Sequence, residues 1–438
     1  MGADRFQTGL ALWHLSTYLT AMSHATLTSA IEDWLIGKAL ADPDILTLFE
    51  KVCERLRAVG IPLDRAALSW PTLHPLFRAE QLYWYPGSGA ELEQYAHERT
   101  GAHLWQKSPF FHVHEKGLSH LRRHLTGPGA VLDFEILETF RDKGFTDYLV
   151  TSTDFKIANT EHFAGGNTGI MASWQTKRTS GFTDDDLEAL RRVQRVFAVA
   201  CRASIQRRVM LNLANAYLGP TAASEVLGGD IRRGDGERIP AVVWFSDLRG
   251  STRLSDTMDP DSYLQLLNRY FECTAKPVID NGGEILNFIG DGVLAIFPIV
   301  AECPKGAAAN AETAVRTALE LQQKAELEGT PGNAPLRFGV GLAIGEVMFG
   351  NIGVQERLAF SGIGKVVNTV TRVEQATKAL GPQVLALKSY ADVAPGTWVS
   401  AGEIEISDFD RNMEVFTLQE HAQQSPSAQI ATERTPAE

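Results

Sequence analysis

The sequence predicts a mixed α/β (α+β) protein with two domains joined by a helix. Between about residues 240 and 350, an apolar run, a helical span, a hairpin, a second helix and a long apolar strand follow in that order. This order is typical of a ferredoxin-like antiparallel sheet with helices on one face. Before it, short apolar runs alternate with Gly, Pro and Ser turns, and an amphipathic span without Gly or Pro connects the two regions.

The length of the chain fits this organisation, since 438 residues suffice for two or three domains. A formal net charge of −12 argues against nonspecific binding to nucleic acid or to a membrane surface. The four cysteines lie far apart without a Cys-x-x-Cys pattern, and no apolar span is long enough to cross a bilayer. We therefore expect a cytoplasmic protein without a membrane or nucleic-acid partner.

The first part of the chain divides into a helical segment, 1–45, and a domain, 46–205, whose first helix is Ile45–Val59. Within this domain Leu118–Leu125 is predicted to be a helix, and Pro71 confines the first strand to an edge of the sheet. The strands are expected at Ala66–Leu73, Ala79–Tyr85, Val131–Leu137, Asp147–Ser152 and Gly169–Gln175.

The amphipathic span 187–217 is predicted to be one long helix, either a dimer stalk that relays a signal or a helix lying on its own domain. It runs into a helical and polar linker, 206–238. A second domain follows at 239–420, with helices at Cys303–Glu328 and Lys365–Leu380 and bends permitted by glycines in the strand Leu336–Gly350. The polar, Pro-containing tail 421–438 is expected to be disordered.

Two carboxylates mark the candidate site in the second domain. The buried run Ala241–Phe245 ends at Asp247, and the hairpin Glu284–Pro298 carries Asp291 in its turn. A small-residue turn, Gly250–Thr252, follows the first strand and allows backbone N–H groups to approach a ligand. This combination suits a divalent metal bound with a nucleoside triphosphate. Singly, each aspartate would be an ordinary turn residue.

The residues of these segments resemble the motifs of the class III adenylate/guanylate cyclase catalytic domain. Three stretches carry the resemblance, which covers roughly residues 236–420: Phe245-Ser-Asp-Leu-Arg-Gly-Ser-Thr252, Phe288-Ile-Gly-Asp-Gly-Val-Leu-Ala-Ile-Phe297 and Ile363-Gly-Lys-Val-Val-Asn-Thr-Val-Thr-Arg-Val-Glu374. The resemblance implies an obligate homodimer that converts ATP into 3′,5′-cyclic AMP and pyrophosphate with two Mg²⁺ or Mn²⁺ ions per site. The alternatives are a guanylate cyclase that uses GTP and a degenerate nucleotide-binding regulator.

The resemblance also implies roles for single residues. Asp247, Asp291 and the carbonyl of Leu248 would hold the metals, while Gly250, Ser251 and Thr252 would bind phosphates. Asn368 would orient the ribose, and Arg372 would stabilise charge on the α-phosphate of nucleotide held by the other subunit. Arg249 is interpreted as a surface charge.

Three positions depart from the family pattern. Asn287 stands where a Lys is usual and Ser361 where an Asp or Thr is usual, and both positions normally select the base. Adenine remains the better expectation, because Asn can donate and accept and Ser is close to Thr. Ser407 replaces a Lys that often reaches the terminal phosphates, which puts catalytic efficiency in doubt.

The N-terminal domain resembles a GAF-type sensor only loosely, through Gly169-Ile-Met-Ala-Ser-Trp174 and the helix start after Gly181-Phe-Thr183. The resemblance implies regulation by a small-molecule or protein signal that the sequence does not identify. Five histidines cluster in this domain, at positions 103, 112, 114, 120 and 124. His112 and His114 would share a strand face, but no recognised metal spacing is completed, so solvated or core histidines are favoured.

Overall fold

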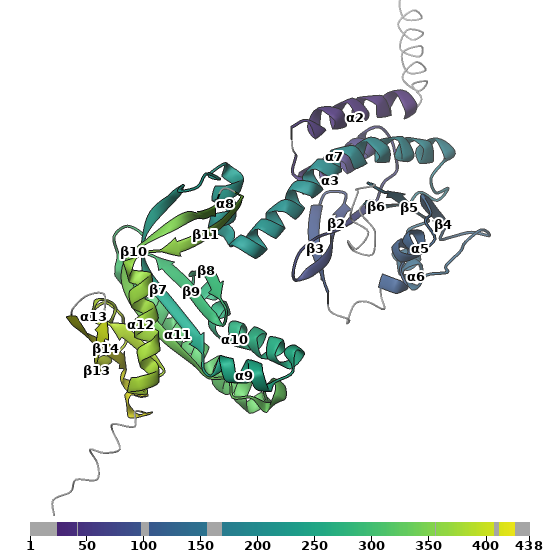
Figure 1. Ribbon diagram of the computed structural model, residues 1–438. Helices are drawn as coiled ribbons and strands as arrows, with labels where there is room; N and C mark the ends of the chain where they lie inside the picture. Colours follow the sequence, from purple (N-terminus) through teal and green to yellow (C-terminus); the bar gives the residue numbers. More distant parts are fainter. Residues whose placement is uncertain are drawn as a thin grey trace, which may run out of the picture. The chain divides into compact units, whose positions relative to one another are not determined.

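The computed structural model describes residues 24–41, 43–97, 105–155, 169–354, 356–406 and 411–424. The chain forms two compact units that divide between Ala216 and Tyr217 (Figure 1). The domain boundaries expected from the sequence stay predictions, and most of the tail after residue 420 lies outside the described ranges.

The N-terminal unit contains a six-stranded sheet in the order β3-β2-β1-β6-β5-β4, antiparallel throughout. Its strands are β1 (Arg65–Pro71), β2 (Phe77–Tyr85), β3 (Gly89–Ala96), β4 (His120–His124), β5 (Asp147–Thr153) and β6 (Ile170–Thr176). Apolar side chains on one face of the sheet form a core with α2 (His24–Ala39), α3 (Ile45–Ala58) and α7 (Asp184–Leu218). The other face packs against α5 (Pro109–Glu115) and α6 (Glu135–Asp142).

Several sequence predictions for this unit are wrong. The segment Leu118–Leu125 forms the strand β4, because pairing with β5 prevails over its helical apolar spacing. The expected strand Val131–Leu137 is absent from the described sheet, and the helix α6 begins at Glu135 instead. Strand β3 was not predicted.

Pro71 does not confine its strand to an edge, because it is the last residue of β1, which pairs with both β2 and β6. At that end of the strand its missing N–H costs little pairing. His112 and His114 lie on the helix α5, where residues two apart do not share a face.

The helix α7 confirms the long helix expected over 187–217. Its first two-thirds are buried in the N-terminal core through side chains such as Leu190, Phe197 and Ile205, whereas no residue beyond Ile205 in this helix is fully buried. In the later part, Arg208 and Asn212 donate hydrogen bonds to Glu80 and Thr72 of the same unit. The helix therefore lies on its own domain for most of its length.

The C-terminal unit contains an eight-stranded sheet in the order β13-β14-β12-β10-β7-β9-β8, with β11 added beside β10. The strands are β7 (Gly236–Leu248), β8 (Glu284–Ile289), β9 (Gly292–Pro298), β10 (Phe338–Val354), β11 (Arg357–Ile363), β12 (Val384–Leu387), β13 (Trp398–Ile406) and β14 (Arg411–Leu418). All pairs are antiparallel except β10 with β12. The helices are α8 (Pro220–Gly228), α9 (Ser251–Thr257), α10 (Pro260–Asp280), α11 (Pro304–Glu328), α12 (Lys365–Leu380) and α13 (Lys388–Ala391).

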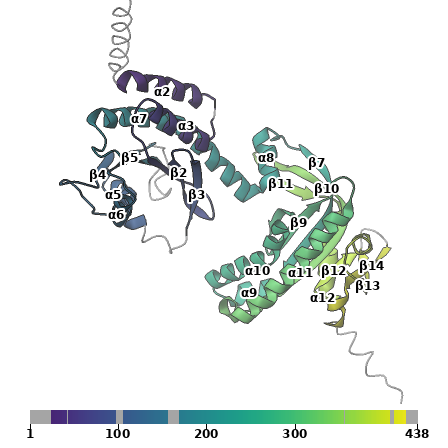
Figure 2. The same ribbon diagram turned by 180° about the vertical axis from the view of Figure 1, so that it is seen from behind.

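Helices cover both faces of this sheet (Figures 1 and 2). Val242 and Trp244 of β7 pack with α10 and α11, which confirms the predicted ferredoxin-like arrangement with both helices on one face. The alternating residues, such as Val243, pack with Val366 and Val370 of α12 on the opposite face. The helix α12 is thus added outside the core motif.

The glycines of β10 allow α12 to pack closely on the strand. A Cβ on Gly341 would lie 2.5 Å from the carbonyl oxygen of Val370, and one on Gly345 would lie 2.8 Å from Cβ of Val366. Glycine at these positions therefore lets α12 lie directly on the strand, which brings the end of α12 beside the end of β7.

Candidate active site

The two predicted metal-binding carboxylates meet at one edge of the sheet. Asp247 is the penultimate residue of β7 and pairs with Gly292, so it lies beside Asp291 in the hairpin turn. Both side chains are half-buried. Burial and the negative charge of Asp291 together raise the pKa of Asp247, although Lys378 acts in the opposite direction. The pair is therefore electrostatically strained without a further cation.

The donor set fits a divalent ion that shares its coordination with a ligand. Asp291 Oδ2 is buried and has no hydrogen-bond partner among the described residues. A buried carboxylate oxygen without a partner is costly, and a hard cation bound through oxygen would satisfy it. The described residues include no cluster of three or more His, Cys, Asp or Glu that could hold a metal alone. Substrate oxygens would have to complete the coordination.

A third charged group beside the acid pair was not found from the sequence. Lys378, in the last turn of α12, places Nζ 3.4 Å from Asp247 Oδ2. The ion pair is half-exposed, with 51% of the Lys378 side chain accessible. Because 131 residues separate the two, no local pattern could indicate it, and it depends entirely on α12 packing across β10.

Arg249 is not the surface charge expected from the sequence. Its Nη1 lies 2.9 Å from Oε1 of Glu374 on α12, and the Glu374 side chain is only 1% exposed. The pKa of Glu374 is raised to about 7, mainly by burial. The positive charge of Arg249 lowers this pKa, whereas the negative charge of Asp247 raises it further. The site edge thus holds three carboxylates, Asp247, Asp291 and Glu374, and two cations, Arg249 and Lys378.

The predicted phosphate-binding turn begins the helix α9. Gly250 adopts φ 70°, the left-handed region that glycine reaches without strain. Ser251 and Thr252 then form the first turn of the helix, where backbone N–H groups have no partner within the helix. The turn follows Asp247 by three residues and is partly exposed.

The two predicted base-selecting residues contact each other. Asn287 Nδ2 donates a hydrogen bond to Ser361 Oγ, although 74 residues separate them. This contact brings together the hairpin strand β8 and the added strand β11. The pair retains the Asn287 carbonyl oxygen as an acceptor and the Ser361 hydroxyl hydrogen as a donor.

Asn368 and Arg372 lie on the exposed side of α12, whereas Val370, Glu374 and Thr377 of the same helix face the sheet. Arg372 donates to Gln375 of its own helix at 3.2 Å. None of the interactions among the described residues joins Asn368 or Arg372 to Asp247 or Asp291. The structure therefore does not bring the two halves of the predicted site together within one chain.

Comparison with known proteins agrees with this geometry. The family described as adenylate and guanylate cyclase catalytic domain matches residues 237–390. The C-terminal half of this chain is a class III adenylate/guanylate cyclase catalytic domain. The matched residues include both aspartates, the turn after β7 and the start of α12.

Among relatives of this cyclase domain, an adenylate cyclase of Anabaena cylindrica is 30% identical over 156 residues, covering 34% of this chain and 29% of that protein. The match thus spans less than a third of that relative. The crystal structure of the adenylyl cyclase CyaB from P. aeruginosa shares 25% identity, covering 42% of this chain and 95% of that one, with a TM-score of 0.37. The guanylyl cyclase Cya2 shares 29% identity, covering 43% and 98%, with a TM-score of 0.36.

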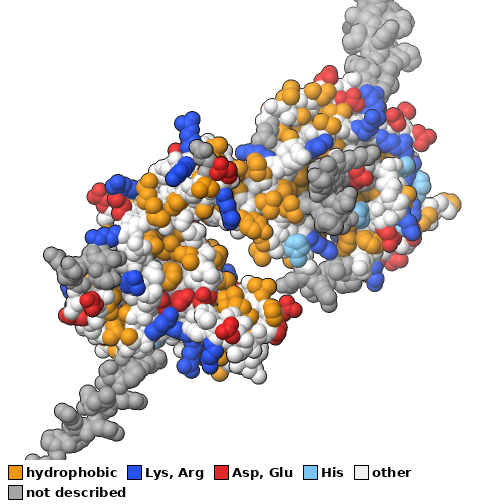
Figure 3. All heavy atoms as spheres, in the orientation of Figure 1, with side chains coloured by type: hydrophobic (Ala, Val, Ile, Leu, Met, Phe, Trp, Pro, Cys, Tyr) orange, Lys and Arg blue, Asp and Glu red, His pale blue; other side chains and the backbone are white. Residues whose placement is uncertain are grey.

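Exposed apolar side chains border the cyclase site. Phe288 and Ile289 at the end of β8 are 57% and 54% exposed, and Ile363 at the end of β11 is 49% exposed. Figure 3 shows hydrophobic side chains interspersed with polar and charged ones on the surface of the C-terminal unit. These residues flank the Asn287–Ser361 pair, so an apolar surface adjoins the predicted base-binding position.

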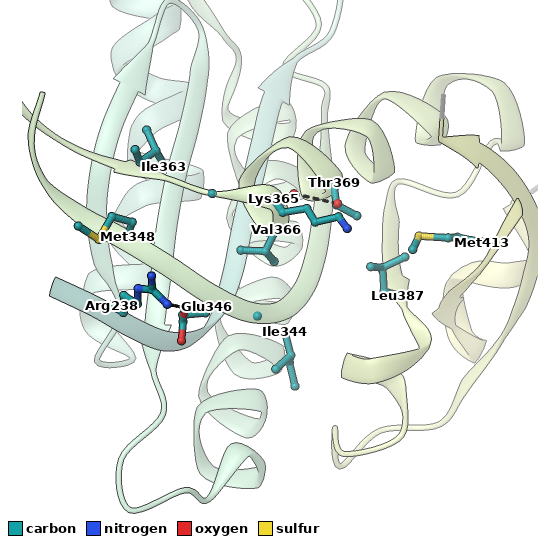
Figure 4. A pocket seen from close by; sticks show the side chains of 12 residues that line it. Arg238, Ile344, Glu346, Met348, Ile363, Lys365, Val366, Thr369, Leu387 and Met413 are labelled. Carbon is teal, nitrogen blue, oxygen red and sulfur yellow. Dashed lines mark hydrogen bonds and ion pairs between the residues drawn. The ribbon is translucent and has the colours of Figure 1, made fainter. Parts of the chain in front are cut away.

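A separate hollow of about 700 Å³ lies at the start of α12 (Figure 4). Arg238 and Glu346 form an ion pair on one side of it, and Leu387 and Met413 lie on the other. Neither aspartate of the acid pair lines it. The hollow is therefore distinct from the predicted metal site.

Two residues singled out from the sequence lie outside the described residues. They are Ser407, expected near the terminal phosphates, and His103 of the histidine cluster. His112 contacts the ring of Phe134 edge-on, with centroids 5.5 Å apart.

None of the helices that the structure describes combines the length and the hydrophobicity needed to span a bilayer. The likeness of the N-terminal unit to a GAF-type sensor stays a prediction.

Proposed function

We propose that the protein is an adenylate cyclase that converts ATP into 3′,5′-cyclic AMP and pyrophosphate at a homodimer interface, under the control of its N-terminal unit. The observation that carries the proposal is the acid pair Asp247–Asp291 with its unpartnered carboxylate oxygen, in a domain of the cyclase family. A half-buried pair of like charges at the end of a strand would be stabilised by a divalent cation, and a structural role explains it poorly.

In the reaction, the ribose 3′-oxygen attacks the α-phosphorus, its proton leaves, and the bond to the β-phosphate oxygen breaks to release pyrophosphate. Asp247 and Asp291 would hold Mg²⁺ or Mn²⁺, with the Leu248 carbonyl. When bound, these ions acidify the 3′-hydroxyl and neutralise the phosphates. Backbone N–H groups at Gly250, Ser251 and Thr252 would bind phosphate oxygens, as at other helix starts.

On the opposite side of the nucleotide, Asn368 would orient the ribose by hydrogen bonding. Arg372 would donate to the α-phosphate oxygens, whose charge grows in the transition state. Both side chains are exposed and lack contact with the acid pair of their own chain. This supports a two-fold symmetric dimer in which each site takes its acid pair from one chain and its Asn and Arg from the other. The apolar surface at Phe288, Ile289 and Ile363 supports burial of this region between chains.

The Asn287–Ser361 contact supports adenine as the base. With Nδ2 engaged, Asn287 offers its carbonyl oxygen to the adenine N6 amino group, and the Ser361 hydroxyl can donate to N1. The adenylate cyclase of Anabaena cylindrica supports the same choice. Guanine could bind the same two groups, because its O6 can accept from the Ser361 hydroxyl and its N1–H can donate to the Asn287 carbonyl oxygen. GTP is therefore the second candidate substrate.

The decisive assay incubates the purified chain with Mn²⁺ and either ATP or GTP and separates the products by chromatography. We expect cyclic AMP as the main product. Asn287→Lys should raise the kcat/KM ratio of ATP over GTP, since Lys donates to adenine N1. Cyclic GMP as the main product would reverse the base assignment, and no turnover would favour a nucleotide-binding regulator.

The shared site is tested by mixing two inactive proteins, Asp247→Ala and Arg372→Ala. A heterodimer contains one site with both wild-type halves, so activity should return. Random exchange at equal amounts gives about a quarter of wild-type sites. If subunit exchange is demonstrated and no activity returns, the shared-site arrangement is wrong.

A further inference from the structure

A buried arginine in the N-terminal unit forms no ion pair with any residue that the structure describes. Arg65 begins β1, at the centre of the six-stranded sheet, and is only 7% exposed. It lies on the sheet face opposite the α2–α3–α7 core, opposite Gln175 of β6 in the register. None of the ion pairs among the described residues includes it. Arginine stays protonated inside proteins, so its charge is uncompensated there.

The neutral groups around Arg65 satisfy only part of the guanidinium. Its Nε donates to the Tyr85 hydroxyl at 3.0 Å, and Nη1 donates to Gln175 Oε1 at 2.8 Å. The guanidinium carries five N–H donors, so three have no acceptor among the described residues, and Nη2, which makes none of these bonds, is not fully buried. Gln175 is fixed in this orientation because its Nε2 donates to Ser173 Oγ at 3.2 Å.

Aromatic rings surround the same group. The Arg65 guanidinium carbon lies 5.1 Å from the ring centroid of Tyr83 and 4.9 Å from that of Phe140. These rings attract the cation but accept no ordinary hydrogen bond. Burial raises the pKa of Tyr83 and of Tyr148, so both remain neutral phenols and cannot supply a negative charge.

Other buried charges in this unit are matched, which makes Arg65 an exception. The fully buried Asp147 pairs with Arg122 at 2.6 Å, and Glu80 pairs with Arg208 at 2.6 Å. A single cation with unused N–H donors fits a monoanion, and the planar guanidinium of arginine can bind a carboxylate through two hydrogen bonds. The adjacent rings would contact an apolar or aromatic body.

We propose that Arg65 anchors a small organic carboxylate in the N-terminal unit, with Tyr83 and Phe140 contacting its apolar part. The ligand supplies the charge that the described residues do not. This proposal is independent of the cyclase assignment, because every residue that it uses lies in the N-terminal unit.

The test is calorimetric titration of the full chain with benzoate and with acetate. Acetate is included because it carries the carboxylate on a small body that needs little space. Benzyl alcohol and inorganic phosphate serve as the neutral and the phosphate comparisons. We expect saturable carboxylate binding that is at least about tenfold tighter than that of benzyl alcohol and is lost in Arg65→Met. Arg55→Met, which changes an exposed arginine stacked on Trp34, should bind benzoate like the wild type.

A second variant keeps the test valid if Arg65→Met fails to fold. Gln175→Glu places a carboxylate beside Arg65 within the chain, so it should raise the melting temperature and abolish benzoate binding. The proposal is overturned if neither carboxylate binds, if phosphate binds in their place, or if benzoate still binds to either variant. A lowered melting temperature of Gln175→Glu would also overturn it, because Arg65 would then not lack a negative charge.

Discussion

The buried Glu80 of the N-terminal unit and the carboxylates at the site edge of the cyclase unit have pKa values that shift in opposite directions. In the N-terminal unit, Glu80, Asp147 and Asp186 are almost fully buried and each is paired with an arginine. Burial alone would raise the pKa of Glu80, but hydrogen bonds from Arg208 and Gln94 prevail and lower it. In the cyclase unit, the pKa values of Asp247 and Glu374 are raised instead.

The difference separates structural carboxylates from site carboxylates. A structural carboxylate is neutralised by its own chain and contributes to the fold. A site carboxylate such as Asp247 has a second carboxylate beside it and, among the described residues, only a half-exposed lysine as its cationic neighbour, so a bound cation would stabilise it. Removing the arginine partner of a structural carboxylate should therefore reduce stability, whereas removing the charge of Asp247 should increase it.

The largest effect is expected for Arg208→Met. It leaves Glu80, which is 1% exposed, without its ionic partner and should reduce the free energy of unfolding by about 3–5 kcal/mol. Urea denaturation measures the loss, and Arg202→Met on the exposed side of α7 is the control, expected to change stability by less than about 0.5 kcal/mol. A loss as small as that of the control would mean that Glu80 is not held by this pair.

Glu374→Gln should change how stability depends on pH. The pKa of Glu374 is about 7 in the folded protein and 4.5 in its ordinary state, so the folded protein keeps a proton that the unfolded chain releases between these values. Wild-type stability should therefore fall as pH rises through this window, by on the order of 2–3 kcal/mol. The variant lacks this fall.

Urea denaturation at about pH 5 and about pH 8 gives the comparison. Glu320→Gln on the exposed side of α11 should keep the wild-type pH dependence. An equal fall in Glu374→Gln and the wild type would assign the pH dependence to other groups.

Asp247→Asn should stabilise the metal-free protein, by on the order of 1 kcal/mol at neutral pH, because it removes one of two adjacent negative charges. The same change should weaken Mn²⁺ binding by about 10–100-fold. Thermal unfolding without metal and Mn²⁺ titration followed by electron paramagnetic resonance measure the two effects. Asp256→Asn on the exposed side of α9 is the control. Destabilisation in the absence of metal would place Asp247 with the structural carboxylates.

Lys378→Met should have the smallest effect on stability. The ion pair with Asp247 is 3.4 Å long and half-exposed, so its removal should cost less than about 1 kcal/mol. Mn²⁺ should bind more tightly, because Lys378 no longer competes for Asp247. Lys324→Met, which breaks an exposed pair within α11, should leave Mn²⁺ binding unchanged. Weaker Mn²⁺ binding in Lys378→Met would show that the lysine assists the site instead.

The sequence by itself determined the elements whose signals are local and strong. The α12 helix begins and ends at the predicted residues, Lys365 and Leu380, and the hairpin around Asp291 is confirmed. The cyclase family also followed from three continuous stretches. Short apolar runs were ambiguous, and Leu118–Leu125 became a strand because its pairing partner β5 lies elsewhere in the chain.

Only the tertiary structure decided the electrostatics of the site. Lys378 beside Asp247, Arg249 beside Glu374 and the Asn287–Ser361 contact join residues 131, 125 and 74 positions apart. These contacts depend on α12 lying against the glycines of β10 and on β11 lying beside β8. The energy of a charge depends on its neighbours within a few ångströms and on its burial, and neither is encoded by the residues adjacent to it in the sequence.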